Sequence, residues 1–262
     1  MIRFAAVIVA LMLAAVPAMA DTVDDFTAAV PGIPSKTWMD LLKQLFPDIT
    51  VGPKNEAIVH GDIALRSIEE DGAFTDECQD ELKLRSLEVA QVRMSGKNRL
   101  IVGVATDGDT CAAPLALFEG SGDGKLLDAA NVKQDKNYSF GRDFVRSLGP
   151  DGQLVVVTNF HVNAGEGYDT ETLVLATADK LSSIGSVFAK SETDCRRSIS
   201  TEATISLAPD YGPFARITGY IKTGTRRVAA DCQTPRGKEM ITIDRIDWRW
   251  SAARKAYRKV AR

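Results

Sequence analysis

The chain has 262 residues, of which 45% are hydrophobic and 26% are charged, and its formal net charge is −3. This length is enough to bury a core as one all-β domain or as two smaller domains, so disulfide bonds would supplement a core rather than replace it. Acidic residues outnumber basic ones in residues 21–130, and the reverse holds in residues 131–262. The basic residues of segment 83–99 are not interleaved with aromatic residues, so we expect no nucleic-acid partner there.

Residues 1–20 have the pattern of a secretory signal peptide. Arg3 precedes an apolar run that ends in Ala18-Met19-Ala20, a small-x-small cleavage pattern. We therefore expect cleavage after residue 20 and an exported protein, periplasmic or secreted, that is soluble once cleaved. No Cys follows the expected cut, and no later apolar stretch is long enough to span a bilayer, so neither a lipid anchor nor a transmembrane anchor is expected.

The segment 21–83 is acidic and predicts one short helix. Ser35 is the expected N-cap, and Pro47 is expected to end the helix. Apolar side chains recur at spacings of three and four between them: Trp38, Leu41, Leu42, Leu45 and Phe46. Residues 51–83 give no clear assignment, and His60 is interpreted as structural because too few ligands accompany it for a zinc site.

Residues 84–262 are expected to form an all-β domain, possibly continuous with 21–83. Short runs of Val, Ile, Leu and Thr alternate with turn clusters such as Gly149-Pro150-Asp151-Gly152. This alternation is typical of an antiparallel β-meander.

Two segments of this region, Gly96 to Val132 and Pro150 to Val187, align at an offset of 54 to 55 residues. A third, looser copy runs from Phe214 to Val260. Each copy predicts a turn, an apolar strand, a polar loop, a second apolar strand and a third strand that begins with Lys-Leu in the first two copies. Such blade-like internal repeats favour either a partial or curled propeller-like sheet or a sandwich of two sheets.

The four cysteines, Cys78, Cys111, Cys195 and Cys232, form no CxxC pair. An even number of cysteines in an exported chain indicates two structural disulfides. We expect Cys78 to pair with Cys111 and Cys195 with Cys232, since each bond then closes a local segment. A zinc site is the alternative.

The stretch Thr158 to Leu173 carries the densest set of polar candidates. On an extended strand Asn159, His161 and Asn163 share one face, and Tyr168 is expected to close the following turn. In a first interpretation these side chains only satisfy backbone groups around a loop. In a second, hard oxygen ligands from two repeats hold calcium: Asp107, Asp109, Glu166 and Asp169. In a third, His161 is a general base oriented by Asp169 or Glu166, although no GxSxG elbow supplies a nucleophile.

Two further features lie near the C-terminus. Trp248 and Trp250 share one face of a predicted strand, either as an exposed platform for a sugar or protein partner or as core residues with Arg249 facing solvent. The chain from Arg245 to Arg262 is strongly basic. This basic end either complements the acidic half of the chain or binds an anionic glycan or lipid head group.

These observations predict a non-enzymatic exported protein of the cell envelope, a binding, inhibitory or accessory module that recognises a protein or glycan partner with its hairpin loops. No cofactor is expected unless calcium binds. The alternative is a periplasmic hydrolase of an envelope polymer that uses His161 with a nearby carboxylate. The predicted binding residues are Asn159, His161, Asn163, Glu166, Tyr168, Asp169, Trp248 and Trp250.

Overall fold

The computed structural model describes residues 20–52, 56–60, 65–69, 81–107, 112–135, 137–163, 166–232 and 234–260. The predicted signal peptide, apart from Ala20, therefore lies outside the described residues. So do Cys78, Asp109 and Cys111, and with them the predicted Cys78–Cys111 bond.

The described chain is mostly β-structure with one helix, α1 (Trp38–Leu45), which confirms the predicted fold class. The strands of the N-terminal half are β1 (Ala20–Val23), β2 (Ala29–Val30), β3 (Ile33–Thr37), β4 (Thr50–Val51), β5 (Ala57–Val59), β6 (Leu82–Met94), β7 (Lys97–Thr106), β8 (Pro114–Glu119) and β9 (Leu126–Asn131). Those of the C-terminal half are β10 (Asn137–Ser139), β11 (Val145–Gly149), β12 (Gly152–Asn163), β13 (Glu166–Thr177), β14 (Leu181–Thr193), β15 (Arg197–Ala208), β16 (Arg216–Val228), β17 (Pro235–Ser251) and β18 (Ala256–Val260).

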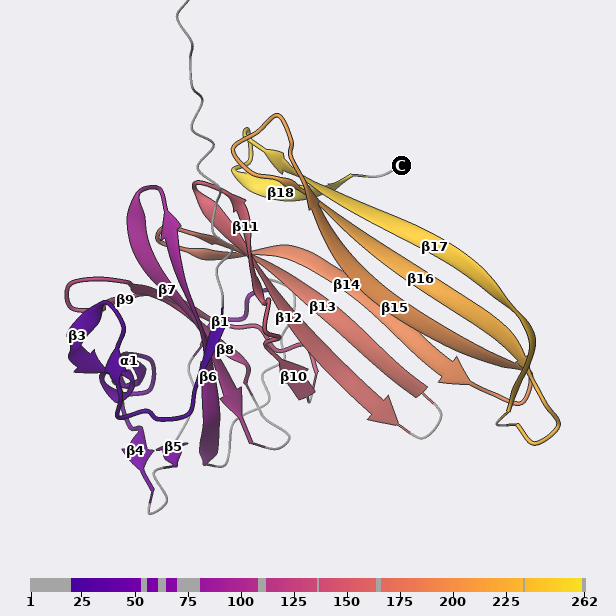
Figure 1. Ribbon diagram of the computed structural model, residues 1–262, viewed down its shortest axis with the longest axis horizontal. Helices are drawn as coiled ribbons and strands as arrows, with labels where there is room; N and C mark the ends of the chain where they lie inside the picture. Colours follow the sequence, from indigo (N-terminus) through magenta and orange to yellow (C-terminus); the bar gives the residue numbers. More distant parts are fainter. Residues whose placement is uncertain are drawn as a thin grey trace, which may run out of the picture.

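The strands form two large antiparallel sheets (Figure 1). The first has the order β4-β5-β6-β7-β8-β9, with β1 also paired to β6. The second has the order β10-β12-β13-β14-β15-β16-β17-β18, with β11 also paired to β12. The two aligned segments of the sequence become the meanders β7-β8-β9 and β12-β13-β14, one in each sheet. Their origin as repeats stays a prediction.

The alternation of side chains along each strand divides the interior into three apolar layers. In β12, Val155 and Val157 face the first sheet, in a cluster that also holds Ile101 of β7. Leu154 and Val156 point to the opposite side, into a cluster shared with the C-terminal strands. The two sheets therefore share a central core, and this arrangement fits the sandwich alternative better than the partial or curled propeller-like sheet.

A buried arginine also connects the two sheets. The side chain of Arg99 in β7 donates to the carbonyl oxygen of Ala178, and its Nη2 lies 3.1 Å from Asp179 Oδ1. Because burial strengthens such charge-assisted bonds, this contact fixes one sheet against the other.

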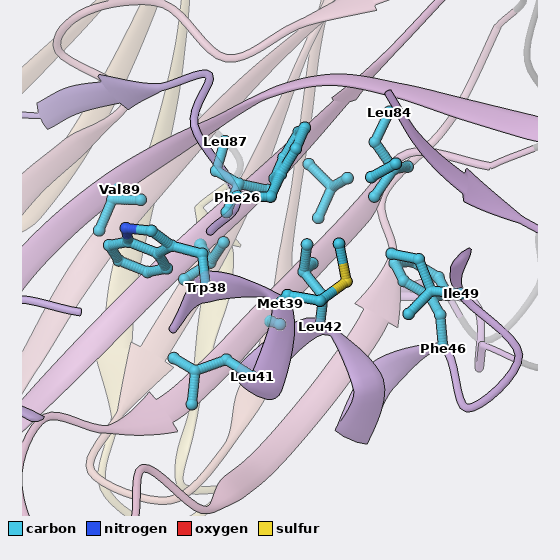
Figure 2. Packing of buried hydrophobic residues seen from close by; sticks show 14 of the residues in the cluster. Phe26, Trp38, Met39, Leu41, Leu42, Phe46, Ile49, Leu84, Leu87 and Val89 are labelled. Atoms are coloured by element: carbon cyan, nitrogen blue, oxygen red, sulfur yellow. The ribbon is translucent and has the colours of Figure 1, made fainter. Parts of the chain in front are cut away.

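The helix α1 covers the outer face of the first sheet, where Trp38, Leu42 and Phe46 pack against residues of β6 (Figure 2). Its N-cap is Thr37 and not Ser35, so that detail of the prediction is wrong. Ser35 lies in β3, whereas the Thr37 hydroxyl accepts from the Asp40 N–H at 3.2 Å and the Asp40 carboxylate accepts from the Thr37 N–H at 2.9 Å. This capping box lowers the pKa of Asp40 through the hydrogen bonds from Thr37.

The third layer forms where β15 to β18 curve over β12 and β13. Trp248 is 2% exposed in this layer, and Trp250 packs against it. Gly219 lies close beneath the indole, because a Cβ there would sit 2.8 Å from Val187 and 3.3 Å from Trp248. The two tryptophans thus belong to the core, and the exposed platform is the alternative that the structure does not support.

Candidate functional site

Beyond its core, the second sheet continues as a single layer (Figure 1). The connections from β12 to β13, from β14 to β15 and from β16 to β17 all lie at this end, which we call the hairpin end. Large apolar side chains are exposed along it: Val162, Phe188, Met240, Ile241 and Ile243. Exposed apolar side chains gathered at one end of a sheet are typical of an interaction surface.

The hairpin end is braced covalently. The Cys195–Cys232 disulfide, which confirms one of the two predicted pairings, joins the connection after β14 to the connection after β16. A disulfide of this kind is consistent with an oxidising compartment. It holds these two hairpins in a fixed relative position.

Ion pairs on neighbouring strands add to this bracing. Lys190 Nζ lies 2.8 Å from Glu166 Oε1 and 2.9 Å from Glu192 Oε2, and Arg197 lies 3.1 Å from Glu192. The hydrogen bond to Glu166, followed by that to Glu192, raises the pKa of Lys190 above its usual range. Because these groups are exposed, each pair adds little to stability, but together they cross-link β13, β14 and β15.

His161 forms a cluster with Tyr168 and with a carboxylate that was not among the predicted residues. His161 Nδ1 lies 3.1 Å from Asp135 Oδ1. The imidazole stacks on the Tyr168 ring, with centroids 5.2 Å apart and planes at 7°, and the Tyr168 ring contacts Phe188 at 5.5 Å. A hydrogen bond with Asp135, together with burial, raises the pKa of Tyr168.

Asp135 replaces the carboxylates that were expected to orient His161. Asp169 is paired with Phe160, so its side chain lies on the opposite face of β13 from Tyr168, and Glu166 is bound to Lys190. The expectation that one of these two acids orients His161 is therefore wrong. Asp135 lies in the connection between β9 and β10, and it is buried.

Asn159 is fully buried beside this cluster and serves the backbone. Its Oδ1 accepts from the Gln134 N–H at 2.8 Å, and its Nδ2 donates to Thr172 Oγ1 at 3.0 Å. The side chain of Gln134 donates in turn to Glu69, whose pKa is raised by burial. These bonds fasten the β9–β10 connection to β12, as the first of the three interpretations of this stretch expects.

The turn itself is shorter than the sequence suggests. β12 runs to Asn163 and β13 begins at Glu166, so Tyr168 lies within a strand rather than closing a turn. The side chain of Asn163 lies outside the described part of the structure. His60, the other histidine, bonds through Nε2 to Thr50 Oγ1 at 2.8 Å, which fits its structural interpretation.

The predicted calcium ligands do not converge in the described part of the chain. Glu166 and Asp169 point to opposite faces of β13, and Asp107 lies at the end of β7 in the first sheet. Among the described residues, no group of three or more His, Cys, Asp or Glu side chains is placed to hold a metal ion.

Two cavities open beside the third layer. The larger, about 420 Å³, lies between the β11–β12 turn and residues 207–215. The smaller, about 240 Å³, is lined by Arg146, Thr158 and Glu171 among others. Burial raises the pKa of Glu171 against the opposing hydrogen bond that Thr158 donates to it at 3.1 Å.

Comparison of the chain with protein-family models, with curated proteins and with solved structures finds no match in any of the three. Within the part of the chain that the structure describes, no helix has the length and apolar character needed to cross a bilayer. The candidate site therefore rests on its own geometry: a braced hairpin end with exposed apolar side chains, adjoining the cluster of Asp135, His161 and Tyr168.

Proposed function

We propose that this protein is a non-enzymatic exported module of the cell envelope that binds a protein or glycan partner with its hairpin end. One observation carries the proposal. The hairpin end extends beyond the hydrophobic core and exposes apolar side chains, yet the Cys195–Cys232 disulfide holds its hairpins together. Pre-organisation of such a surface lowers the entropic cost of binding. Apolar side chains that remain exposed add little hydrophobic stabilisation to the fold, so folding alone does not explain this surface.

Export is supported by the leader pattern of residues 1–20 and by a disulfide that an oxidising compartment would preserve. The test is mass spectrometry of the N-terminal peptide of the protein from fractionated cells. A mature N-terminus at Asp21 in the exported fraction is the expected result, and an intact Met1 in the cytoplasmic fraction would contradict export. Cleavage there removes a single residue, Ala20, from β1.

Partner binding is tested by placing a photo-cross-linking amino acid at Phe188, which is 51% exposed at the hairpin end. Tyr211 is the matched control, because it is an aromatic residue fully exposed on the β15–β16 connection, at the other end of the second sheet. Irradiation of whole cells should give a discrete adduct from position 188 and none from position 211. Equal labelling from both positions, or labelling from neither, would remove the hairpin end as the recognition surface.

One observation favours a second candidate, a hydrolase of an envelope polymer. In the Asp135–His161 pair, the carboxylate contacts Nδ1, and no described residue hydrogen-bonds to Nε2. A general base has this arrangement. No hydroxyl or thiol of a described residue hydrogen-bonds to His161, so the nucleophile would have to be a water molecule.

One substitution distinguishes the two candidate functions. His161→Gln should abolish turnover of purified envelope polymer if the hydrolase is correct, while the binding candidate predicts that no turnover is measurable in the parent protein. His60→Gln is the matched control, because it removes the other histidine, which bonds to Thr50 away from the Asp135–His161 pair, and it should leave any turnover unchanged.

A further inference from the structure

Three arginines stand in a row across adjacent strands, at the opposite end of the second sheet from the hairpin end. Arg249 of β17 is paired directly with Arg258 of β18. In the next pair of strands, Ile217 is opposite Trp248, so continuing the antiparallel register by one residue sets Arg216 of β16 beside Arg249. Directly opposite side chains in a sheet have Cβ atoms about 5 Å apart, so the three side chains start close together.

All three arginines lie on the outer face of the sheet. Their chain neighbours Ile217, Trp248 and Tyr257 point inward to the third apolar layer, and successive side chains alternate between faces. Since these neighbours are buried, the row cannot rotate away from its face. The packing of the core thus holds like charges side by side.

Three other basic residues on this face have acidic partners. Arg245 is bound to Asp247 at 2.8 Å, Arg226 to Glu239 at 3.3 Å, and Lys222 lies 4.0 Å from Glu202. By contrast, no ion pair joins Arg216, Arg249 or Arg258 to any residue that the structure describes.

A second, independent observation concerns Arg216. Its Nε is the one buried side-chain nitrogen or oxygen without a hydrogen-bond partner in the described part of the chain. A buried donor that is left unsatisfied destabilises the folded state, and a charged one does so more strongly. This guanidinium therefore has no acceptor at Nε among the described residues, in addition to lacking an ion pair, and an anion with several acceptor oxygens would compensate the charge of the row.

We propose that Arg216, Arg249 and Arg258 form a binding site for a phosphate ester. Phosphate matches the guanidinium group because its oxygens accept two parallel hydrogen bonds from one arginine, and a single phosphate can bridge neighbouring arginines. The site is separate from the hairpin end, so it does not depend on the function proposed above. The phosphate group can belong to a soluble ester or to a lipid head group, and the experiment separates these two sources.

The experiment uses the mature protein and inorganic pyrophosphate as the probe, measured by isothermal titration calorimetry at low ionic strength. We expect binding that weakens at least about tenfold in Arg249→Gln/Arg258→Gln and falls steeply with added salt. Lys222→Gln/Arg226→Gln is the matched control, since it also removes two basic side chains, these already paired with Glu202 and Glu239, and it should change the affinity less than twofold. No binding by the parent, or equal losses in the double variant and the control, would overturn the site.

Folding of the double variant is checked by thermal unfolding. Because like charges are removed, its midpoint in phosphate-free buffer should not fall, and pyrophosphate should raise the midpoint of the parent more than that of the variant. An equal rise in both would overturn the site. Flotation with phosphatidylglycerol vesicles, against phosphatidylcholine vesicles, then identifies the source: retention that the double variant loses points to a lipid head group, and pyrophosphate binding without retention points to a soluble ester.

Discussion

Gly103 and Phe140 provide a sharp test of how the two sheets are joined. Gly103 lies in the middle of β7, and a Cβ at this position would sit 2.6 to 2.7 Å from three atoms of the Phe140 ring. The ring is buried and held edge-on by Tyr138 and Phe144, with centroid distances of 5.7 and 5.6 Å. It therefore has no room to retreat from an added methyl group.

Gly103→Ala should lower the free energy of unfolding by about 1 to 3 kcal/mol, the usual cost of overpacking a core. In a Phe140→Ala background, which alone should cost about 3 to 5 kcal/mol, the same change meets no ring. There it should stabilise the strand by roughly 0.5 to 1 kcal/mol, since Ala loses less backbone entropy than Gly. The cycle thus predicts a coupling free energy of roughly 1.5 to 4 kcal/mol between the two positions.

Urea unfolding followed by tryptophan fluorescence measures each corner of this cycle. Gly141→Ala is the control, because a Cβ at this exposed neighbouring position meets no atom within 4 Å, and it should leave stability nearly unchanged. If Gly103→Ala changes the free energy of unfolding equally with and without the Phe140 ring, the close contact between β7 and the ring is not the reason for a glycine at position 103, and the reasoning fails.

Three further predictions concern single features. The double substitution Cys195→Ser/Cys232→Ser removes a disulfide that closes a loop with a sequence separation of 37. The chain-entropy relation predicts that the free energy of unfolding falls by about 4 kcal/mol. A calorimetric unfolding midpoint that barely moves would contradict this. Thr37→Ala should lower the free energy of unfolding by about 1 kcal/mol, whereas Ser35→Ala should leave it almost unchanged, because only Thr37 caps α1. Equal urea midpoints for the two variants would refute this. Glu171→Gln should raise the free energy of unfolding at neutral pH, because the raised pKa of Glu171 means that its carboxylate destabilises the folded state. The gain should vanish below about pH 4, where the carboxyl is protonated in both the folded and the unfolded chain. Urea unfolding at both pH values measures this, and a gain that persists at low pH would disprove the assignment.

The strands and the single helix follow from local patterns, which is why they could be predicted. Alternation placed Asn159 and His161 on one face of a strand, and the register with Thr170 and Tyr168 confirms it. The N-cap was missed because two hydroxyl residues precede the helix, and only the extended conformation of β3 excludes Ser35.

The candidate site was only half predictable, for a topological reason. Asp135 reaches His161 because β10 pairs with β12, and nothing in the spacing of 26 residues between them indicates that contact. Similarly, two tryptophans two residues apart give the same sequence pattern whether that face of the strand is buried or exposed to solvent. The curvature of the C-terminal strands decides that Trp248 is buried, and curvature of a sheet is not encoded in local alternation.

The last hairpin has a consequence for how copies of this protein meet one another. Residues 247–251 of β17 pair with β18, and no described strand pairs with residues 235–246 on that side, so their backbone donors and acceptors could join a strand of another molecule. Met240, Ile241 and Ile243 are exposed along that edge, while Lys238 and Asp244 flank them with charge. Flanking charges are a common protection against edge-to-edge association, and salt screens them. Salt should therefore promote self-association at this edge while it weakens phosphate binding at the arginine row, so the two ends of one sheet respond to ionic strength in opposite directions.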